Sequence, residues 1–413
     1  MKRARFLGRN FNLVKSHNVR AILLTLLHSG SLSRVELADR IGLSSTTITN
    51  LTSELISEGI IEEQDTSGQT GQRGVGRPRT MLVLVPNARY AIGVHIGVGL
   101  FRVAVTNLHA EIIASQNQQF EISSPAEQVL EAIAATIKEL IPRSGIKKEQ
   151  VLSIGVGASG LVDHELGVNV YAPRLQWRDI PIRTQLEEAL HCPVFVENNV
   201  RSMALAEALF GRGQETDVLA FVYGRIGVGA GFIVKGSIFR GSGAGAGEMG
   251  HTTMLPDSGK VCTCGNRGCL ETLVSEPVLL QKAHEHLQKT PDSLLYRLVE
   301  DSKGELSIDM VFEAARQGDP ILTQIIQDQA VYLGIALANL VNVLNPELIL
   351  LGGMFAQGKD LFLPIVEQTV RERAFGGLGK KVKVEITSFG WQAGVIGASS
   401  VALASSFYHG SSS

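Results

Sequence analysis

Two short stretches near the middle of the chain guide the interpretation of the rest: GEMGH at residues 247–251 and CTCGNRGCLE at residues 262–271. Three of the chain's four cysteines lie in the second stretch, and a histidine lies just upstream. Thiolates and an imidazole are the ligands that tetrahedral zinc prefers, and four protein ligands leave no open position for water. The sequence therefore predicts a structural Zn²⁺ ion that holds this loop in shape, with the ligands His251, Cys262, Cys264 and Cys269.

Two alternatives for these cysteines stay open: they could be incidental buried thiols, or two of them could form a disulfide. The chain starts Met1-Lys2-Arg3 with no apolar signal segment, which predicts a cytoplasmic protein, and disulfides are rare in that compartment. Gly265 and Gly268 suit a tight metal-binding turn. The remaining cysteine, Cys192, is most simply a small core residue.

Two carboxylates flank the predicted metal ligands. Glu248 lies three residues before His251, and Glu271 lies two residues after Cys269. A loop ordered by zinc would therefore present both carboxylates beside the imidazole. Such a group of polar side chains could bind the hydroxyls of a sugar.

These motifs resemble those of the ROK family (repressors, open reading frames, kinases), which contains bacterial sugar kinases and sugar-responsive repressors. The resemblance extends to VENNVR at residues 196–201 and to GVGAG at residues 227–231, and it covers roughly residues 90 to 400. It implies an α/β body of two lobes around a cleft, which is the actin-like ATPase (ribonuclease H-like) architecture. It also implies that the following positions bind the sugar: Asn198, Asn199, Glu248, His251 and Glu271.

Length and charge indicate a further unit in front of this body. A chain of 413 residues exceeds the usual limit of one hydrophobic core, so we expect two or three domains. Residues 1–90 hold 12 Lys+Arg against 7 Asp+Glu, whereas the remainder holds 26 against 33. Because residues 1–90 are basic and the remainder is acidic, we expect only the N-terminal segment to bind a polyanion. No apolar stretch reaches the roughly 18 residues of a membrane span, so we expect no membrane partner.

The front segment has the pattern of a helix-turn-helix. Apolar residues recur at helical spacing over residues 18–27, which predicts a first helix. A capping box at Ser33 predicts the start of a second helix, which ends near Gly42. A third helix is expected to start at Ser44 or Ser45 and to end near Gly59. Two short helices joined by a tight turn with glycine are typical of this motif. We expect base or phosphate contacts from Arg34 and from five residues of the third helix: Ser45, Thr46, Thr47, Thr49 and Asn50.

Two strands, at residues 60–61 and 81–85, enclose a glycine-rich loop with Arg77 and Arg79, which completes the pattern of a winged helix-turn-helix. An arginine of the wing could enter the minor groove, whose negative potential attracts it. The alternatives are a protein-interaction or dimerisation module for the three helices and a solvated linker for the loop. We place this DNA-binding domain, with its linker, at residues 1–88.

The body alternates strands and helices. Residues 91–96, 101–106 and 112–116 predict three consecutive strands, a helix follows over 125–142, and a second copy of the plan starts near residue 218. We expect a first lobe at residues 89–200. We expect a second lobe at residues 201–413, with the zinc loop, the dimer contact and effector binding.

The chain lacks residues that a sugar kinase of this fold requires, namely a carboxylate base and phosphate-binding loops with an acid for magnesium. By the resemblance, Asn199 replaces the base, and an amide does not usefully accept a proton. His95 and Val98 replace the aspartate and a glycine of the first phosphate loop, and Arg225 begins the altered second loop. We therefore expect no enzyme activity.

The sequence thus predicts a DNA-binding transcriptional regulator, most simply a repressor of genes for carbohydrate uptake or catabolism. A sugar or sugar phosphate would change its affinity for double-stranded operator DNA, and the protein would act as a homodimer or tetramer. A ROK-type sugar kinase with a DNA-binding domain and a non-enzymatic interaction protein are the alternatives. Arg174 replaces an asparagine common in the family, and could bind a phosphate or uronate group or form an ion pair.

Overall fold

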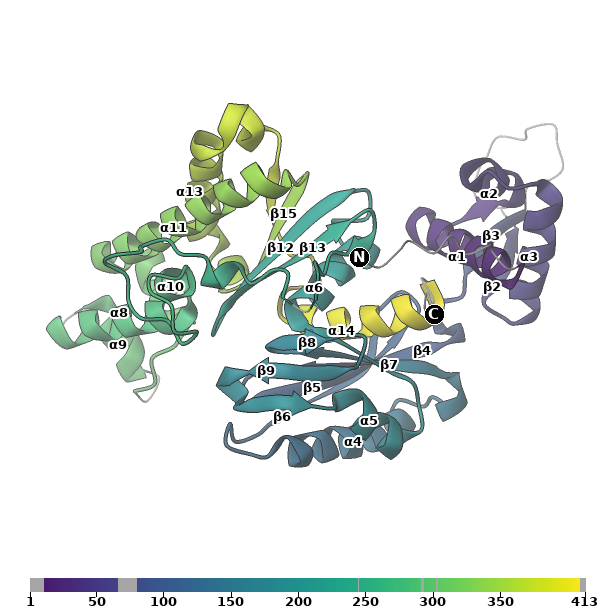
Figure 1. Cartoon of the computed structure of the whole chain (residues 1–413), viewed down its shortest axis with the longest axis horizontal. Coiled ribbons are helices and arrows are strands. Elements are labelled where there is room, and N and C mark those ends of the chain that lie inside the picture. The colour runs from purple at the N-terminus through teal and green to yellow at the C-terminus, as the bar shows by residue number, and fades with distance from the viewer. Residues whose placement is uncertain (1–10, 66–79, 244, 291–292, 302–303, 409–413) are drawn as a thin grey trace.

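The computed structural model describes residues 11–65, 80–243, 245–290, 293–301 and 304–408. Figure 1 shows a small N-terminal unit beside two α/β lobes. This arrangement confirms the expected fold class, a winged helix-turn-helix followed by a two-lobed α/β body.

The N-terminal unit is a three-helix cluster with a small antiparallel sheet of order β1-β3-β2. Its elements are α1 (Phe11–Ser29), β1 (Leu32–Ser33), α2 (Arg34–Ile41), α3 (Ser45–Ser57), β2 (Ile61–Asp65) and β3 (Thr80–Leu84). The short strand β1 was not foreseen in the sequence. The expected wing, with Arg77 and Arg79, falls at residues 66–79 and lies outside the described residues.

Local side-chain bonds set the ends of α2 and α3 where the sequence predicts them. The Ser33 hydroxyl accepts from the Glu36 amide while the Glu36 carboxylate accepts from the Ser33 amide, which is a complete capping box. Gly42 ends α2 in the left-handed conformation, with φ of 73°. The Ser44 side chain then caps α3 by accepting from the Thr47 amide.

The first lobe is built on a five-stranded sheet of order β11-β7-β4-β5-β6, covered on one face by α4 and α5. A three-stranded sheet of order β10-β9-β8 lies beside it. The elements are β4 (Tyr90–Ile96), β5 (Leu100–Asn107), β6 (Ile112–Gln119), α4 (Ala126–Arg143), β7 (Val151–Ala158), β8 (Leu161–Asp163), β9 (Val168–Ala172), β10 (Trp177–Ile180), α5 (Ile182–Leu190) and β11 (Val194–Asn198).

The second lobe repeats this plan. Its sheet has the order β14-β13-β12-β15-β16, with three antiparallel strands followed by two parallel ones, as in the first lobe. The strands are β12 (Val218–Gly224), β13 (Val228–Val234), β14 (Ser237–Ile238), β15 (Leu348–Gly353) and β16 (Lys383–Ile386). The helices are α7 (Glu271–Val274), α8 (Glu276–Lys289), α9 (Leu294–Asp301), α10 (Ile308–Arg316), α11 (Pro320–Leu344), α12 (Met354–Gln357) and α13 (Lys359–Arg373). The expected duplication is therefore a duplication of topology.

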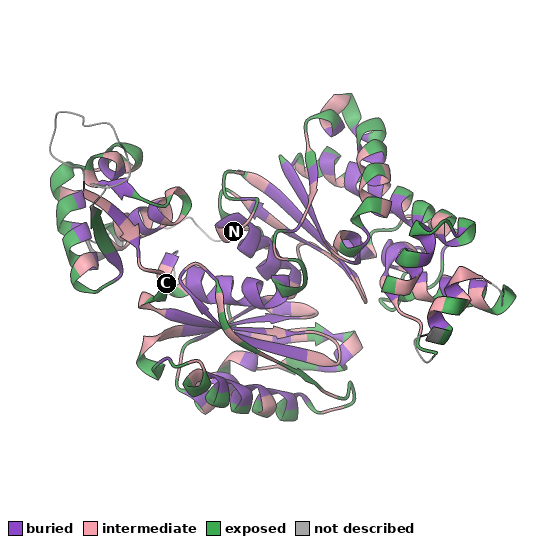
Figure 2. Ribbon diagram, turned by 180° about the vertical axis from the view of Figure 1, so that it is seen from behind, coloured by how far each residue is buried: buried purple, intermediate pink, exposed green. Residues whose placement is uncertain are grey.

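Two buried helices join the lobes: α6 (Asn199–Phe210) and α14 (Ala393–Leu403). Figure 2 shows both almost entirely in the colour of buried residues. The last helix, α14, packs against β4 and β7 of the first lobe as well as against α6. A Cβ at Gly155 of β7 would lie 1.9 Å from the Ala398 carbonyl oxygen, so glycine permits this close approach. The first lobe therefore includes the C-terminal helix α14 as well as the strands that begin the body.

Helix α11 is long and apolar enough to cross a membrane by length and composition. Its apolar residues instead pack inside the second lobe, and Leu322, Ala330, Leu333, Leu337 and Val341 are fully buried there. The helix is therefore a core helix of this lobe.

The N-terminal unit contacts the body through α1. Leu24 of α1 and Phe210, the last residue of α6, pack against the same buried apolar residues, and α1 contacts the short π-helix η7 (Ala404–Tyr408) that follows α14. Phe210 and Tyr408 form an edge-to-face pair with ring centroids 6.1 Å apart. Burial lowers the pKa of His28 at the end of α1, and a hydrogen bond to the Leu209 backbone partly offsets this effect.

Candidate functional site

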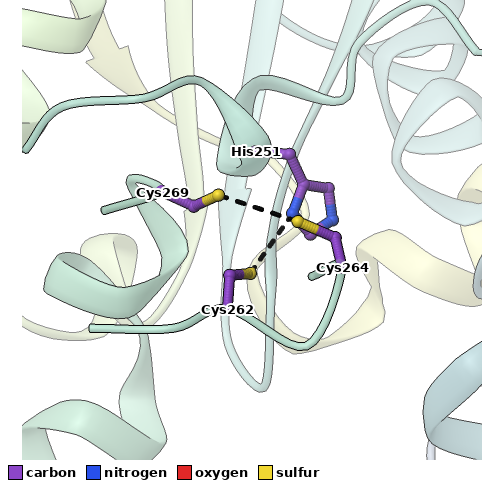
Figure 3. Close-up of side chains that lie close together, drawn as sticks. All are labelled: His251, Cys262, Cys264 and Cys269. Atoms are coloured by element: carbon purple, nitrogen blue, oxygen red, sulfur yellow. Dashed lines mark hydrogen bonds between the residues drawn. The ribbon is translucent and has the colours of Figure 1, made fainter. Parts of the chain in front are cut away.

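The four predicted metal ligands come together. One ligand atom from each of His251, Cys262, Cys264 and Cys269 lies within 4.8 Å of the others. Figure 3 shows the three thiols and the imidazole facing a common centre, with Cys262 Sγ 3.6 Å from His251 Nδ1 and Cys264 Sγ 3.7 Å from Cys269 Sγ. All four cysteines of the chain are free thiols. The donor set and its closure fit a structural metal ion.

The cysteine loop is held by local backbone geometry. The short helix η4 (Met249–His251) presents the imidazole, and an isolated bridge joins Val261 to Arg267 across the loop. Gly265 and Gly268 have φ of 90° and 69°, as expected for a tight turn. A second isolated bridge, between Thr253 and Cys269, ties the loop back to the segment after His251.

A cavity of about 400 Å³ lies between the lobes beside this loop. This volume is in the usual range of small-molecule sites. It is lined by all five predicted sugar-binding residues, Asn198, Asn199, Glu248, His251 and Glu271, and also by His95, Arg174, Tyr223 and Arg225. The structure thus places the two carboxylates, the imidazole and the two amides in one cavity.

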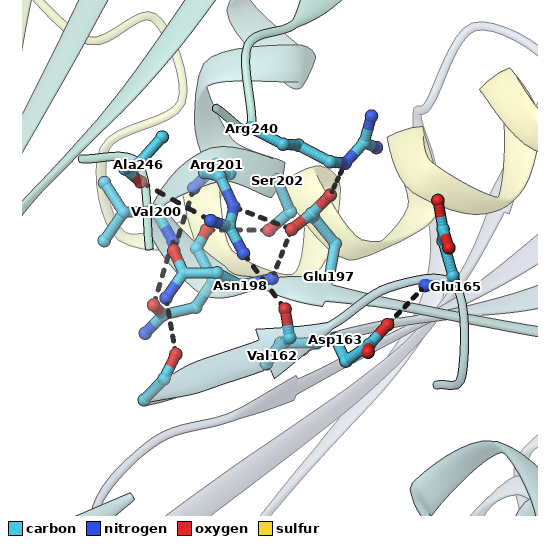
Figure 4. Close-up of polar contacts among 12 residues, drawn as sticks. Val162, Asp163, Glu165, Glu197, Asn198, Val200, Arg201, Ser202, Arg240 and Ala246 are labelled. Carbon is cyan, nitrogen blue, oxygen red and sulfur yellow. Dashed lines mark hydrogen bonds and ion pairs between the residues drawn. The ribbon is translucent and has the colours of Figure 1, made fainter. Parts of the chain in front are cut away.

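Asn198 and Asn199 open helix α6 at the cavity wall. The Asn198 side-chain oxygen accepts from the amides of Val200 and Arg201, which caps the helix, while its amide nitrogen donates to the Gly160 carbonyl. Asn199 donates to the Ser159 hydroxyl at 3.2 Å. Both amides are therefore held in fixed orientations, and Figure 4 shows Asn198 beside Val200 and Arg201.

A buried carboxylate next to Asn198 anchors the loop that leads to Glu248. Glu197 accepts from Arg201 Nε at 2.7 Å and from Arg240 Nε at 2.7 Å (Figure 4). Arg201 also reaches the Ala246 carbonyl. The side chains of Glu197 and Arg201 are fully buried, so this ion pair is shielded from water. Sequence reasoning missed this role, although the i, i+4 spacing of Glu197 and Arg201 on a helix start could have indicated it.

The two carboxylates of the cavity lie in different environments. Burial raises the pKa of Glu248, an effect that the nearby His251 partly offsets. Glu271 is paired instead: its Oε1 accepts from Arg174 at 2.8 Å and its Oε2 accepts from the Val228 amide at 3.2 Å. Arg174, for which the sequence left a phosphate or uronate contact and an ion pair open, forms an ion pair with Glu271 in this structure.

Two of the altered kinase positions, His95 and Val98, also line the cavity. His95 lies on β4 opposite Arg102 of β5. Burial, together with the positive charges of Arg102 and Arg225, lowers the pKa of His95 to about 3, so the imidazole is neutral at physiological pH. Val98 packs against the apolar core of the first lobe and also lines the cavity.

The predicted DNA-contacting residues of α3 share one accessible face. Ser45, Thr46, Thr49 and Asn50 are exposed and Thr47 is partly exposed, whereas Ile48 and Leu51 face the core. Two of the hydroxyls are already bonded, since Thr49 donates to the Ser45 carbonyl and Thr47 lies 2.9 Å from the Ser44 hydroxyl. Arg34 lies at the start of α2 and pairs with Glu63 of β2 at 2.7 Å, so it braces the unit internally.

Comparisons with known proteins agree with both parts of the chain. Residues 91–405 match the ROK family, and residues 15–62 match a winged helix-turn-helix DNA-binding family. The chain is 29% identical to the xylose repressor of Caldicellulosiruptor bescii over 94% of this chain and 96% of that protein.

Two solved structures are also similar. A ROK family transcriptional regulator, homologous to the E. coli Mlc protein, has 30% identity and a TM-score of 0.80, over 95% of this chain and 96% of that one. A ROK family glucokinase from Streptomyces griseus, solved with glucose and AMPPNP, has 28% identity and a TM-score of 0.67, over 75% of this chain and 98% of that one. The chain therefore belongs to the ROK family and carries an N-terminal winged helix-turn-helix DNA-binding domain.

Proposed function

We propose that this protein is a sugar-responsive, DNA-binding repressor of genes for carbohydrate uptake or catabolism. One structural observation carries the proposal: helix α6 is capped by Asn198 and begins with Asn199 at the cavity, and it ends with Phe210 against the N-terminal unit. A 12-residue helix spans about 18 Å as one rigid element. Repressors among the similar proteins, including the xylose repressor, support the same function.

The effector would bind between the lobes. Its hydroxyls would bind Asn198, Asn199, Glu248, His251 and Glu271. Asn198 caps α6 and Asn199 begins it, whereas the other three belong to the second lobe. Closure of the lobes on the sugar would move α6 relative to the second lobe, and thereby the surface on which α1 rests. A ligand shifts such an equilibrium only through different affinities for the two arrangements.

The structural metal would be zinc, held by His251, Cys262, Cys264 and Cys269. The closed set of three thiolates and one imidazole supports this choice. Zinc would fix the loop that contains His251 and the three cysteines. Because His251 lines the cavity and Glu248 lies directly before this loop, loss of the metal would also weaken sugar binding.

We infer that the chain is a cytoplasmic regulator without kinase activity. Asn199 offers an amide where a kinase needs a base, and its side chain is already bonded to Ser159. His95, neutral and buried, offers no charge for magnesium. The alternative, a kinase with a DNA-binding domain, is favoured only by the similarity to the glucokinase. A coupled assay for ADP release with glucose, xylose and N-acetylglucosamine separates the two; turnover of about one per second or more, as in kinases, would support the alternative.

The DNA contact would be made by the exposed face of α3 and by the wing residues Arg77 and Arg79. A homodimer or tetramer would place two such helices about 34–36 Å apart, or a multiple of this distance, on operator DNA. The decisive experiment is a titration of labelled promoter DNA from beside the protein's own gene, with and without each sugar. A sugar-dependent loss of affinity supports the proposal, whereas failure to bind any such DNA would favour a protein-interaction role for the N-terminal unit.

A further inference from the structure

One end of the cavity is lined by His95, Tyr223 and Arg225, and Arg102 pairs with His95 on the neighbouring strand. Two arginines, Arg102 and Arg225, therefore bring positive charge to this end. Both arginines lie over the ring of Trp391, with Arg102 Cζ 3.6 Å and Arg225 Cζ 5.1 Å from its centroid. Cations stack well on indole, which explains how two like charges are held near one another.

Arg102 is a buried cation whose hydrogen bonds are incomplete. It is 6% exposed, and one nitrogen, Nη1, donates to the Trp391 carbonyl at 2.9 Å. Its Nε and Nη2 atoms have no hydrogen-bond partner within the described ranges, nor does any carboxylate there form an ion pair with it. Buried donors almost always have partners, and a buried charge without one is costly. Two of its three side-chain nitrogens are therefore left for an acceptor, and a negatively charged acceptor would stabilise the cation best.

The residues near Arg102 also offer groups that can bind an anion. Arg225 has a single carboxylate partner, Glu276, at the long distance of 4.0 Å, and its side chain is 38% exposed toward the cavity. Tyr223 lines the same end and offers a phenol hydroxyl. The Nδ1 atom of His95 also lacks a partner within the described part of the chain. Guanidinium groups and hydroxyls are the donors that bind phosphate oxygens.

We propose that this end of the cavity, formed by His95, Tyr223 and Arg225 with Arg102 behind them, binds the phosphate group of a phosphorylated sugar. The sugar ring would then lie toward Asn198, Glu248 and Glu271, because one cavity of about 400 Å³ contains both ends. Arg225 contacts the phosphate from the cavity wall, and Arg102, which pairs with His95 across the two strands, adds its positive charge. This inference rests on the proposed function, since it assigns the class of its effector.

The test is isothermal titration of the full-length protein with matched ligands: glucose and glucose 6-phosphate, N-acetylglucosamine and its 6-phosphate, inorganic phosphate, and AMP. We expect a phosphorylated sugar to bind about tenfold or more tightly than the same sugar without phosphate, and inorganic phosphate to compete with it. Equal affinities within each pair, or no binding of inorganic phosphate or of any sugar phosphate, would overturn the proposal. Binding of AMP alone would overturn the sugar assignment, because the phosphate would then come from a nucleotide.

Variants show whether the arginines are responsible. Arg225→Gln should remove the preference for phosphate and leave the affinity for the unphosphorylated sugar unchanged, and Arg225→Lys should restore part of it because a point charge still binds phosphate. Arg316→Gln is the matched control, since this side chain is 37% exposed and also pairs with a carboxylate, Asp360. Arg102→Gln should also remove the preference for the phosphorylated sugar. Because Arg102 is buried, the melting temperature of the Arg102→Gln protein is measured in parallel to check that it folds. An Arg225→Gln protein that keeps the wild-type preference for the phosphorylated sugar, or that loses affinity for the unphosphorylated sugar as well, would contradict the inference.

Operator titrations keep this inference separate from the proposed function. If a sugar phosphate binds through Arg225 but leaves DNA affinity unchanged, the phosphate site stands and the effector role fails. If an unphosphorylated sugar releases DNA and phosphate adds no affinity, the repressor function stands and the phosphate site fails.

Discussion

Arg174 Nη2 lies 2.8 Å from Glu271 Oε1, so a residue of the first lobe neutralises a predicted sugar ligand of the second. The two residues are 97 positions apart in sequence. Glu271 is the first residue of α7, directly after the cysteine loop, and Arg174 follows β9. The ion pair therefore spans the cavity and links the second lobe, directly after the cysteine loop, to the first lobe.

Glu271→Ala should give a protein that holds its operator and no longer responds to the sugar. Loss of a charge-assisted hydrogen bond costs about 1.5–3 kcal/mol, which is roughly 10–150-fold in sugar affinity. Fluorescence anisotropy of labelled operator, with and without sugar, measures the effect. Glu385→Ala is the control, because Glu385 also pairs with an arginine, Arg212, but on the surface. Release of the Glu271→Ala protein at the wild-type sugar concentration would place the effector site elsewhere.

Metal analysis should find about one zinc per chain, as a closed set of four ligands requires. Cys264→Ser should lower the zinc content, the melting temperature and the sugar affinity together, because the loop loses one of its ligands. Cys192→Ser removes a thiol that does not belong to the cluster and should leave the zinc content unchanged. A stable, sugar-binding Cys264→Ser protein without metal would contradict the zinc assignment.

Thr47→Ala or Asn50→Ala should weaken operator binding, by about 1–3 kcal/mol where the side chain contacts a base edge. Arg77→Ala should weaken binding to all DNA sequences and reduce the salt dependence by about one unit of slope. Sugar affinity, measured by thermal shift in the absence of DNA, should remain unchanged in all three. The Glu271→Ala protein provides the reverse pattern, and the prediction fails if the DNA variants also lose sugar binding.

The stability of the protein should depend on pH through His95. Its pKa is lowered from 6.5 to about 3 in the folded state, so the neutral form contributes stability above pH 6.5 that is lost as the pH falls toward 3. At pH 5 the loss reaches at most about 2 kcal/mol, since the unfolded state then binds the proton more readily. Melting temperatures of wild type and His95→Gln between pH 7.5 and pH 4.5 should therefore converge or cross on acidification. Parallel curves would show that His95 is not responsible.

Phe210→Leu should reduce the coupling between sugar and DNA while leaving each affinity, measured alone, close to wild type. The leucine retains an apolar side chain but loses the edge-to-face contact with Tyr408 next to α1. Coupling is reciprocal, so DNA must weaken sugar binding by the same factor by which sugar weakens DNA binding. Both factors should fall together in Phe210→Leu and stay unchanged in Phe239→Leu, whose exposed side chain follows β14 in the second lobe. An unchanged factor in Phe210→Leu would exclude this end of α6 as the connection.

Features that depend on neighbours in sequence were predictable. The ends of α2 and α3 follow from Ser33, Gly42 and Ser44, because a cap is satisfied by amides two or three residues away. The gathering of three thiols and one imidazole follows from short spacings and from glycines in the left-handed conformation. The sugar-binding positions came from motif resemblance, and the structure gathers them at one cavity. The roles of these residues, and of Arg77 and Arg79 beyond the described ranges, stay predictions.

Other features were decided only by the tertiary structure. The return of α14 to the first lobe, the pairing of Arg174 with Glu271, and the stacking of Arg102 on Trp391 join residues that are far apart in the chain. Arg102 and Trp391 are separated by 289 positions. No periodicity or local motif encodes such a contact, because its free energy is gained only after both lobes have folded and burial has removed the competing water. The sequence by itself therefore determined the local elements and the metal loop, whereas the charge distribution inside the cavity was set by packing of the two lobes.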